Sequence, residues 1–303
     1  MTRSPTDQLR ARIKAAVGEW PHLEYSQAVR AAGMLWHVQM MGAGPDLLLV
    51  HGTGASTHSW RDLMPVLAAE FRVIAFDLPA HGFSDSPARA RLSMPAMADA
   101  IHRLLHVLDV APKIVVGHSA GAAILAQMCL DGSLKPACAI SLNGALLPFE
   151  GVAGKTYSPF AKLLALNPIL PHLIAWRARR DGRGIDELVA STGSKLDDEA
   201  VRFYRQLAGI PRHLAGALGM MSRWELVPLQ AAMSKLEVPV LLVIGLMDGL
   251  IKPDVGHRAA KLLPKAEILE LPELGHVAHE EKPEEIAGII RKFAQKHGVL
   301  IRD

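Results

Sequence analysis

Short runs of apolar residues recur along the first half of the chain, almost without polar interruption. They span residues 47–50, 73–76, 114–116 and 137–142. Strands that are apolar on both sides are typical of a parallel sheet covered by helices on both faces. Segments with helical spacing separate these runs, such as residues 95–109, in which leucine and isoleucine side chains share one face. The alternation predicts an α/β protein with a mostly parallel sheet.

Further elements before and after this region complete the predicted sheet. Alternating apolar and polar residues between 23 and 41, interrupted at Gly33, predict a β-hairpin. Two late apolar runs, 238–244 and 266–271, predict two more strands, so we expect eight strands in total. Helices covering both faces are predicted at residues 6–18, 59–69, 95–109, 122–130, 254–263 and 283–297.

The alternation of strands and helices breaks between residues 145 and 235. This stretch is predicted to be helical, holds no clear strand, and carries a basic cluster of Arg177, Arg179, Arg180 and Arg183. Because the alternation resumes afterwards, we interpret the stretch as an insertion into one sheet. Residues 1–144 and 236–303 are expected to form the core, and residues 145–235 an inserted helical lid.

Composition and charge argue against several classes of protein. Half of the 303 residues are apolar and 21% are charged, as is ordinary for a soluble globular protein. The net charge of +3 is too small to indicate nucleic-acid binding. Cys129 and Cys138 lack a metal-binding spacing and predict buried thiols in a reducing compartment. Neither a signal peptide nor a transmembrane segment is predicted, so we expect a cytoplasmic protein without metal or cofactor.

The pentapeptide Gly117-His118-Ser119-Ala120-Gly121 lies directly between a predicted strand and a predicted helix. Gly-x-Ser-x-Gly alone is weak, because chance supplies it often, but this context is the one that a nucleophile elbow requires. The flanking glycines leave room for a tight turn. That turn presents Ser119 at the carboxyl end of the strand, where α/β sheets bind ligands. We therefore predict that Ser119 is a catalytic nucleophile; the alternative is a glycine-rich turn with a surface serine.

A serine hydroxyl needs a base that accepts its proton, and three late histidines compete for this role. In this arrangement the acid and then the histidine follow the serine in the chain. His257 falls within a predicted helix, which favours a surface role. His276 lies in the loop directly after the last strand, and His279 follows three residues later. We predict His276, because the loop end nearest the strand projects toward the serine.

The remaining catalytic groups are assigned from their places after strands. Asp248 follows the strand at 238–244 and is predicted to orient the histidine, whereas Asp254 is expected to cap the next helix. The oxyanion needs fixed N–H donors, each of which contributes about 3–4 kcal/mol in the transition state. We assign these donors to the backbone amides of Ala120 and of Thr53, in the turn after the strand at 47–50.

Two neighbouring histidines are interpreted structurally. His51 is expected to pack beneath the turn that holds Thr53. His58 opens a predicted helix, so we expect it to face solvent, with a position in the pocket as the alternative.

Two patterns that suggest other ligands are set aside. Asp77 and Asp85 could form a metal pair, but turn residues in a loop rich in glycine and proline explain them as well. The segment Gly154-Lys155-Thr156 is similar to the end of a phosphate-binding loop. That loop needs a glycine five residues earlier, where the chain has Phe149, so no nucleotide site is predicted.

The motifs described so far resemble the α/β-hydrolase superfamily over nearly the whole chain. Longer runs are similar to the magnesium-chelatase accessory proteins of bacteriochlorophyll biosynthesis, the BchO type. The runs that carry this second resemblance are Met34 to Gln39, His51 to Trp60, Gly117 to Asp131 and Ser141 to Leu146. The resemblance implies a role in the magnesium branch of tetrapyrrole synthesis, in support of photosynthesis. It also implies magnesium-chelatase subunits as partners and a cytoplasmic location, peripheral to the photosynthetic membrane.

Two functions from different classes follow as hypotheses. The first is a serine hydrolase that acts on an ester or related acyl bond, with an apolar or tetrapyrrole-like substrate under the apolar lid. Its lid arginines could pair with tetrapyrrole propionates, although a solvated helix face also explains them. The second is a non-catalytic porphyrin-binding or chelatase-assisting protein with a vestigial triad. A haloperoxidase-like or carbon–carbon hydrolase activity stays open on the same residues, and Ser119 excludes an aspartate nucleophile.

Overall fold

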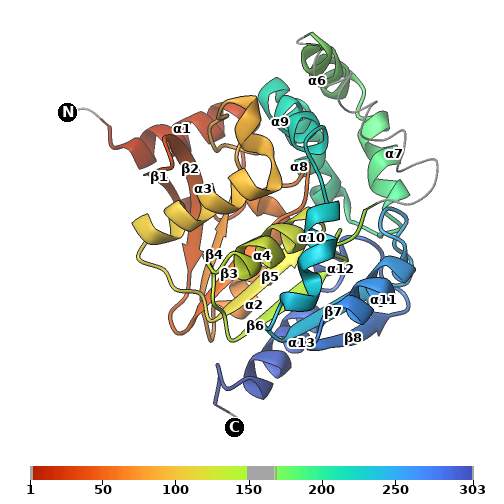
Figure 1. Cartoon of the computed structure of the whole chain (residues 1–303). Coiled ribbons are helices and arrows are strands. Elements are labelled where there is room, and N and C mark those ends of the chain that lie inside the picture. Colours follow the sequence, from red (N-terminus) through yellow and green to blue (C-terminus); the bar gives the residue numbers. More distant parts are fainter. Residues whose placement is uncertain (1–2, 149–166, 168, 302–303) are drawn as a thin grey trace.

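The computed structural model of the chain describes residues 3–148, 167 and 169–301, and an eight-stranded sheet forms its centre (Figure 1). The spatial order is β1-β2-β4-β3-β5-β6-β7-β8. β2 is antiparallel to β1 and β4, and the other neighbours are parallel, which confirms the predicted α/β fold. The strands are β1 (Ser26–Ala31), β2 (Met34–Met41), β3 (Asp46–Val50), β4 (Arg72–Phe76), β5 (Ile114–His118), β6 (Cys138–Leu142), β7 (Val240–Gly245) and β8 (Ala266–Leu271).

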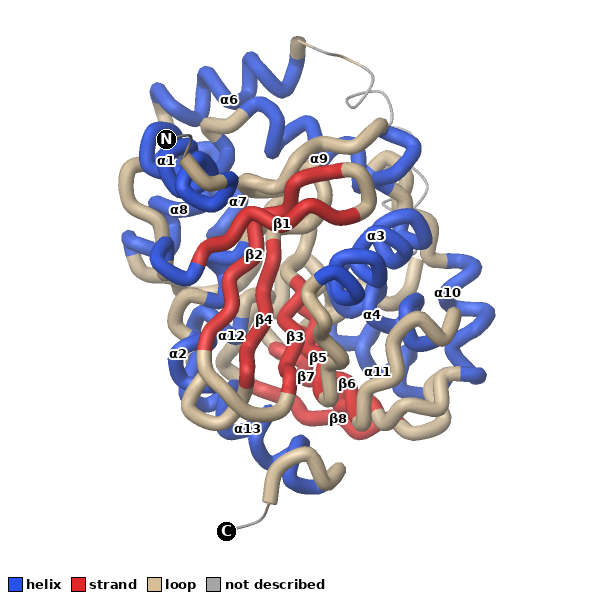
Figure 2. Tube along the Cα trace, turned by 90° about the vertical axis from the view of Figure 1, so that its left-hand side faces the viewer, coloured by secondary structure: helices blue, strands red, loops and turns tan. Residues whose placement is uncertain are grey.

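Helices cover both faces of the twisted sheet (Figure 2). One face is covered by α3 (Met94–Val107), α4 (Ala120–Leu130), α10 (Val227–Ala232) and α11 (Pro253–Leu262). The other face is covered by α2 (Leu63–Leu67), α12 (Ala278–Glu281) and α13 (Pro283–Lys296). The remaining helices, α1 (Pro5–Val17) and α6 to α9, gather at the end of the molecule where the parallel strands terminate.

The apolar strands are buried on both sides because successive side chains point to opposite faces. In β3, Leu48 and Val50 pack into the core beneath α3 and α4, whereas Leu47 and Leu49 pack into the core beneath α2 and α13. All four side chains are fully buried. The continuous apolar runs of the sequence therefore divide into two cores, one on each face of the sheet.

The helix predicted at residues 59–69 is shorter in the structure, and a 3-10 turn precedes it. Residues Thr57–Trp60 form a 3-10 turn, and α2 spans only Leu63–Leu67. Pro65 explains the difference, because proline lacks an N–H donor and is tolerated only in the first turn of a helix. A helix that contains Pro65 in its first turn cannot begin as early as residue 59.

The described residues between β6 and β7 are helical, as predicted for the insertion. They form α6 (Leu170–Arg180), α7 (Arg183–Ser191), α8 (Asp198–Ala208), α9 (Pro211–Met221) and α10, followed by a short 3-10 turn. Asp197 caps α8 by accepting a hydrogen bond from the Ala200 amide. α6 packs against α8 and α9. None of the helices that the structure describes is long and apolar enough to cross a membrane.

The fold predicts opposite effects for two glycine-to-alanine substitutions in helices. A methyl group on Gly121 would lie 2.1 Å from the Val50 carbonyl oxygen, so Gly121→Ala is expected to lower the free energy of unfolding by about 1–3 kcal/mol. Gly288, inside α13, has no neighbour within 4 Å of such a methyl group. Gly288→Ala is the matched control and should stabilise the protein by roughly 0.5–1 kcal/mol. Denaturant unfolding measures both, and equal stability of Gly121→Ala and wild type would disprove the close approach of α4 to β3.

Candidate active site

Ser119 lies at the sharp turn between β5 and α4. Its backbone has φ 51° and ψ −118°, a conformation that non-glycine residues rarely adopt and that marks local strain. The turn is possible because both flanking glycines approach other backbone closely. A methyl group on Gly117 would lie 2.5 Å from Ala122 Cα, and the one on Gly121 would meet β3. This is the strand–turn–helix geometry that the Gly-x-Ser-x-Gly pattern predicts.

His276 and Asp248 come together from the loops that follow β8 and β7. The His276 Nδ1–H donates to Asp248 Oδ2 over 2.7 Å, and both residues are buried. The other carboxylate oxygen, Asp248 Oδ1, accepts hydrogen bonds from the amides of Leu250 and Ile251, each at 2.8 Å. Because both oxygens are engaged, the carboxylate is fixed in orientation and fixes the imidazole in turn.

The backbone of His276 is held by residues beside Ser119. His118, the residue before the serine, donates from Nε2 to the His276 carbonyl oxygen over 3.0 Å. Asn143 donates from its amide nitrogen to the same oxygen over 2.8 Å and to the Gly275 oxygen over 2.7 Å. The rings of His118 and His276 lie 4.7 Å apart between centroids. The serine turn and the histidine loop are therefore joined directly.

Ser119 itself is half-buried, in contrast to the buried His118 before it and Ala120 after it. Among the described residues its hydroxyl makes no hydrogen bond, while its backbone is anchored by the Leu142 carbonyl and the Ala145 amide. The hydroxyl is thus accessible on a fixed backbone.

Thr53 and Ala120, the residues predicted as oxyanion donors, both lie in segments next to Ser119. Ala120 is the first residue of α4, and the first N–H groups of a helix have no partner within it. Thr53 follows Gly52, whose own methyl, if present, would lie 2.9 Å from Ser119 Cβ. The turn of residues 52–55 is therefore next to the serine. His51 is buried beneath it as expected, accepting from the Leu78 amide and donating to the Gly52 carbonyl.

Helix α9 of the insertion contacts the turn of residues 52–55. This contact was not predicted from the sequence. His213 is buried, donates from Nε2 to the Gly54 carbonyl over 3.1 Å and accepts from the Gly82 amide at Nδ1 over 3.0 Å. About two turns further along α9, Met220 accepts a hydrogen bond at sulfur from the Thr53 hydroxyl. Desolvation lowers the pKa of His213 to about 4, so the ring is neutral near pH 7.

A second part of the insertion is joined to the loops of Asp248 and His276. The Thr192 carbonyl accepts from the amides of Gly249 and His276, at 3.1 and 3.0 Å. The Ser194 hydroxyl accepts from the Val277 amide at 3.0 Å. Gly193 between them has φ +73°, and a methyl group there would lie 1.8 Å from the Met247 carbonyl oxygen. Only glycine fits this close crossing of two backbones.

A buried polar cluster links α8 to the segment that follows His276. Glu280 accepts hydrogen bonds from the Tyr204 and Ser59 hydroxyls, each at 2.5 Å, and from Arg61 at 2.9 Å. Burial raises the pKa of Glu280, although Arg61 opposes the shift. His279, the rival candidate for the base, lies within this cluster with Nε2 bonded to Ser59 and stacks on Trp60. Its pKa is lowered to about 3 by burial, which makes it a neutral packing residue.

Two structural expectations about polar residues need correction. His58 is fully buried rather than solvent-facing, with Nδ1 bonded to Ser56, because its 3-10 turn directs the ring toward Trp20 and Tyr204. Asp77 is more than a turn residue: it is buried and accepts hydrogen bonds from His37 at 2.7 Å and from the Thr57 amide at 2.8 Å. These contacts, of which the one with His37 has the largest effect, hold the pKa of Asp77 well below its usual value, although burial alone would raise it.

Three other predictions made from the sequence have different outcomes. His257 lies on the surface as predicted, paired with Glu270 at 3.0 Å. Asp254 is near the start of α11, but no side-chain cap bond is formed there. The segment Gly154-Lys155-Thr156 lies outside the described residues.

The arginines of the basic cluster at 177–183 have different contact partners. Arg179 donates to the Gly209 carbonyl, Arg183 pairs with Asp181 at 2.6 Å, and Arg180 lies over the Trp176 ring at 4.8 Å. Three of the four are thus engaged by groups of the protein itself, and Arg177 is exposed, which favours the solvated-face interpretation.

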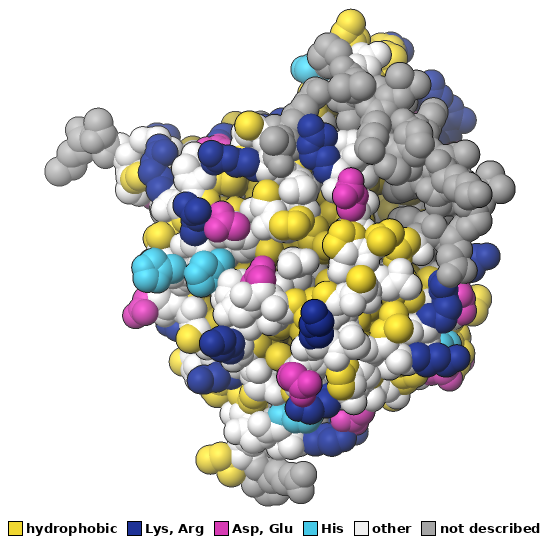
Figure 3. All heavy atoms as spheres, in the orientation of Figure 1, with side chains coloured by type: hydrophobic (Ala, Val, Ile, Leu, Met, Phe, Trp, Pro, Cys, Tyr) yellow, Lys and Arg dark blue, Asp and Glu magenta, His cyan; other side chains and the backbone are white. Residues whose placement is uncertain are grey.

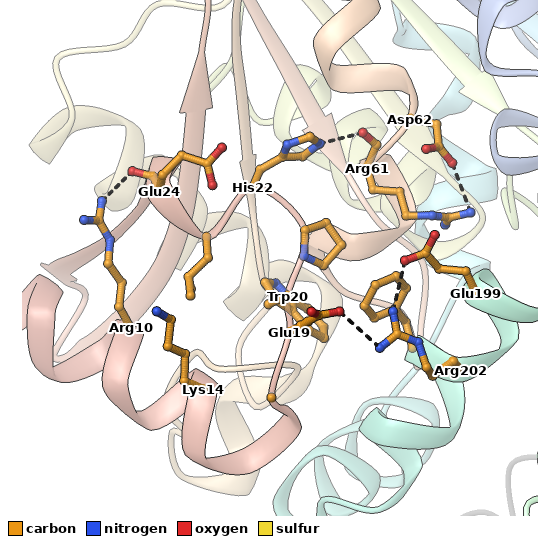
Figure 4. A pocket seen from close by; sticks show the side chains of 14 residues that line it. Arg10, Lys14, Glu19, Trp20, His22, Glu24, Arg61, Asp62, Glu199 and Arg202 are labelled. Atoms are coloured by element: carbon orange, nitrogen blue, oxygen red, sulfur yellow. Dashed lines mark hydrogen bonds and ion pairs between the residues drawn. The ribbon is translucent and has the colours of Figure 1, made fainter.

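A cavity of about 750 Å³ lies apart from the serine, between the end of α1 and α8 (Figure 4). Trp20 and Phe203 contribute aromatic surface. The charged lining residues alternate in sign around the cavity and are Arg10, Lys14, Arg61, Arg202, Glu19, Glu24, Asp62 and Glu199. Arg202 pairs with Glu199 at 3.0 Å, and Arg61 with Asp62 at 3.0 Å. Because cations and carboxylates balance, the cavity favours neither anionic nor cationic ligands.

Comparison with known proteins identifies the class to which this fold and site belong. A profile of the α/β hydrolase fold matches residues 45–283, so the chain belongs to the α/β-hydrolase family. The fold is shared with an α/β hydrolase fold protein from Burkholderia ambifaria, with a TM-score of 0.75 and 23% identity over 88% of this chain and 97% of that one.

Within this family the chain is similar to the magnesium-chelatase 30 kDa subunit of Rhodobacter capsulatus. The two are 38% identical over 279 residues, which cover 91% of this chain and 97% of that protein. This confirms the resemblance drawn from the sequence runs. The chain is also 26% identical to the pimeloyl-[acyl-carrier protein] methyl ester esterase of Vibrio vulnificus, over 86% of this chain and 98% of the esterase.

The buried, neutral His213 predicts a specific dependence of stability on pH. Its folded-state pKa of about 4 lies below the ordinary value of 6.5, so between these values the unfolded chain binds a proton that the folded protein does not. Acidification through this window therefore favours unfolding. In His213→Gln the slope of unfolding free energy against pH should fall by up to about 1.4 kcal/mol per pH unit.

Denaturant unfolding of both proteins at intervals between pH 8 and pH 4 measures this slope. At pH 8 the histidine is neutral in both states, so the difference there reports only lost contacts and serves as the internal control. Parallel curves for wild type and variant would contradict the assignment of a buried, neutral His213.

Proposed function

We propose that the protein is a serine hydrolase that cleaves an ester or a related acyl bond. Ser119 attacks the acyl carbon, His276 accepts the hydroxyl proton, and Asp248 orients His276 and stabilises its protonated form. The observation that carries the proposal is the fixed bond between His276 and Asp248 in the loops after β8 and β7, joined through His118 to the strained turn at Ser119. Each member lies in the order that this fold requires.

The chemistry proceeds in two halves. Attack by Ser119 Oγ forms a tetrahedral intermediate whose oxyanion is held by the backbone amides of Ala120 and Thr53. His276 then donates its proton to the leaving alcohol, and the acyl group stays on Ser119. Water, deprotonated by His276, releases the acid and restores the serine. Neither half needs a metal or cofactor.

The substrate is proposed to be bulky and apolar, and to be enclosed by a lid of residues 145–235. Binding pockets are mostly apolar with a few placed polar groups, and α9 of this insertion contacts the turn beside Ser119 through His213 and Met220. The magnesium-chelatase subunit of Rhodobacter capsulatus supports a tetrapyrrole-like substrate or ligand.

Labelling with a fluorophosphonate probe tests the nucleophile. Wild-type protein should be labelled, and Ser119→Ala should lose the label completely. His276→Ala and Asp248→Asn should slow labelling by roughly three orders of magnitude or more, because the serine loses its base or the base loses its orientation. Ser191→Ala, which changes an exposed serine of α7, is the matched control and should label like wild type.

Folding of each variant is checked by its thermal unfolding curve. A well-folded wild-type protein that takes no label, or a label that persists in Ser119→Ala, would reject Ser119 as the nucleophile.

A second function, assistance to magnesium chelatase without catalysis, is favoured by one observation: the 38% identity to a magnesium-chelatase subunit. The two functions predict different behaviour of Ser119→Ala in a reconstituted magnesium-insertion assay. If a hydrolytic step is needed, the variant should lose the stimulation that the wild-type protein gives. Full stimulation by Ser119→Ala would instead favour a binding or assembly role. Quenching of tryptophan fluorescence by added porphyrin measures ligand binding separately in both proteins.

A further inference from the structure

The outward face of α6 is apolar. Ile169, Leu173 and Trp176 follow one another at intervals of four and three residues, so they share one side of the helix. Their exposed fractions are 71%, 55% and 49%. The opposite side carries the buried Pro171 and Ala175, where α6 packs against α8 and α9. An amphipathic helix normally directs its apolar face to the core, and here part of that face is directed to solvent.

Basic side chains accompany this apolar stripe. Arg177 and Arg180 are exposed, and the Arg180 guanidinium lies 4.8 Å from the centre of the Trp176 ring. The nearby carboxylates of Asp181 and Asp186 are paired with arginines, Asp181 with Arg183 and Asp186 with Arg205, each at 2.6 Å.

The charge next to the stripe is therefore positive. Of the acidic residues in α7, Glu187 remains to oppose Arg177 and Arg180. Figure 3 shows the molecule as spheres in the orientation of Figure 1, with α6 at its upper end.

Among the residues that the structure describes, α6 lies at an end of the molecule. In two perpendicular views it is an outermost helix, at the end of the molecule opposite the C-terminus (Figures 1 and 2). Isolated exposed apolar residues are ordinary, but three on one helix face beside two cations match the composition of helices that lie in a membrane interface. Tryptophan prefers the headgroup level of a bilayer, and arginine is attracted to anionic lipids.

We propose that the α6 face, defined by Ile169, Leu173, Trp176, Arg177 and Arg180, docks the protein on an anionic lipid bilayer. α6 lies parallel to the surface, with the three apolar side chains between the headgroups and the two arginines at lipid phosphates. The docking is reversible, because three side chains and two charges give a shallow contact. It does not depend on Ser119 or on hydrolysis, so it stands or falls apart from the proposed function.

Sedimentation with lipid vesicles tests this docking. The full chain is mixed with vesicles of phosphatidylcholine alone, or of phosphatidylcholine and phosphatidylglycerol at roughly 7:3, in about 0.1 M salt. Wild-type protein should bind the anionic vesicles. Leu173→Ser with Trp176→Ser should weaken this binding about tenfold or more. Val107→Ser, at a residue of α3 that is 55% exposed, is the matched control and should bind like wild type.

The charge contribution is measured separately with Arg177→Gln and Arg180→Gln. Each should weaken binding to anionic vesicles roughly fivefold, without effect on phosphatidylcholine alone. Trp176 is the most exposed of the five tryptophans, so its emission should shift to shorter wavelength on binding. Trp176→Phe should bind but lose most of that shift.

Three results would overturn the proposal. The first is no binding to anionic vesicles by wild-type protein. The second is equal binding by wild type and the Leu173→Ser, Trp176→Ser variant. The third is a change in oligomeric state of that variant in size-exclusion chromatography without a change in vesicle binding, which would assign the face to contact between copies of the chain. Ser119→Ala should bind like wild type, which separates this result from the test of hydrolysis.

Discussion

The close approach of α4 to the sheet is the constraint on which the site depends. Gly117 and Gly121 allow the first turn of α4 to lie against β3 and β5 without side chains between them. This approach forces Ser119 into its strained backbone conformation and fixes its neighbour His118. His118 then reaches the carbonyl of His276, a residue more than 150 positions later in the chain. A local packing constraint thus sets the geometry of residues that are distant in sequence.

The insertion contributes to the same geometry from the other side. Thr192 and Ser194 bond to the loops that carry Asp248 and His276, and His213 bonds to the turn that carries Thr53. These residues are not positioned to react with a substrate. They act by holding the backbone of the segments that carry Asp248, His276 and Thr53. Residues of the core and residues of the insertion therefore both hold the candidate site in place.

The sequence predicted those features that have a local pattern. Unbroken apolar runs identified the strands, and the position of Gly-x-Ser-x-Gly between a strand and a helix identified the turn at Ser119. The pair of Asp248 and His276 could be named because each directly follows a strand. His58 was misjudged because a helix was assumed from residue 59, whereas residues 57–60 form a 3-10 turn that directs the His58 ring inward. His213 and Thr192 could not be found, since contacts across more than 50 residues leave no pattern in their own neighbourhoods.

The close crossing of backbones at Gly193 restricts how the insertion can be replaced. The insertion cannot be exchanged as an independent unit, because residues 192–194 lie between the loops of Asp248 and His276 and contact the backbone of both. A graft of another lid between β6 and β7 would have to reproduce that three-residue crossing, including its left-handed glycine.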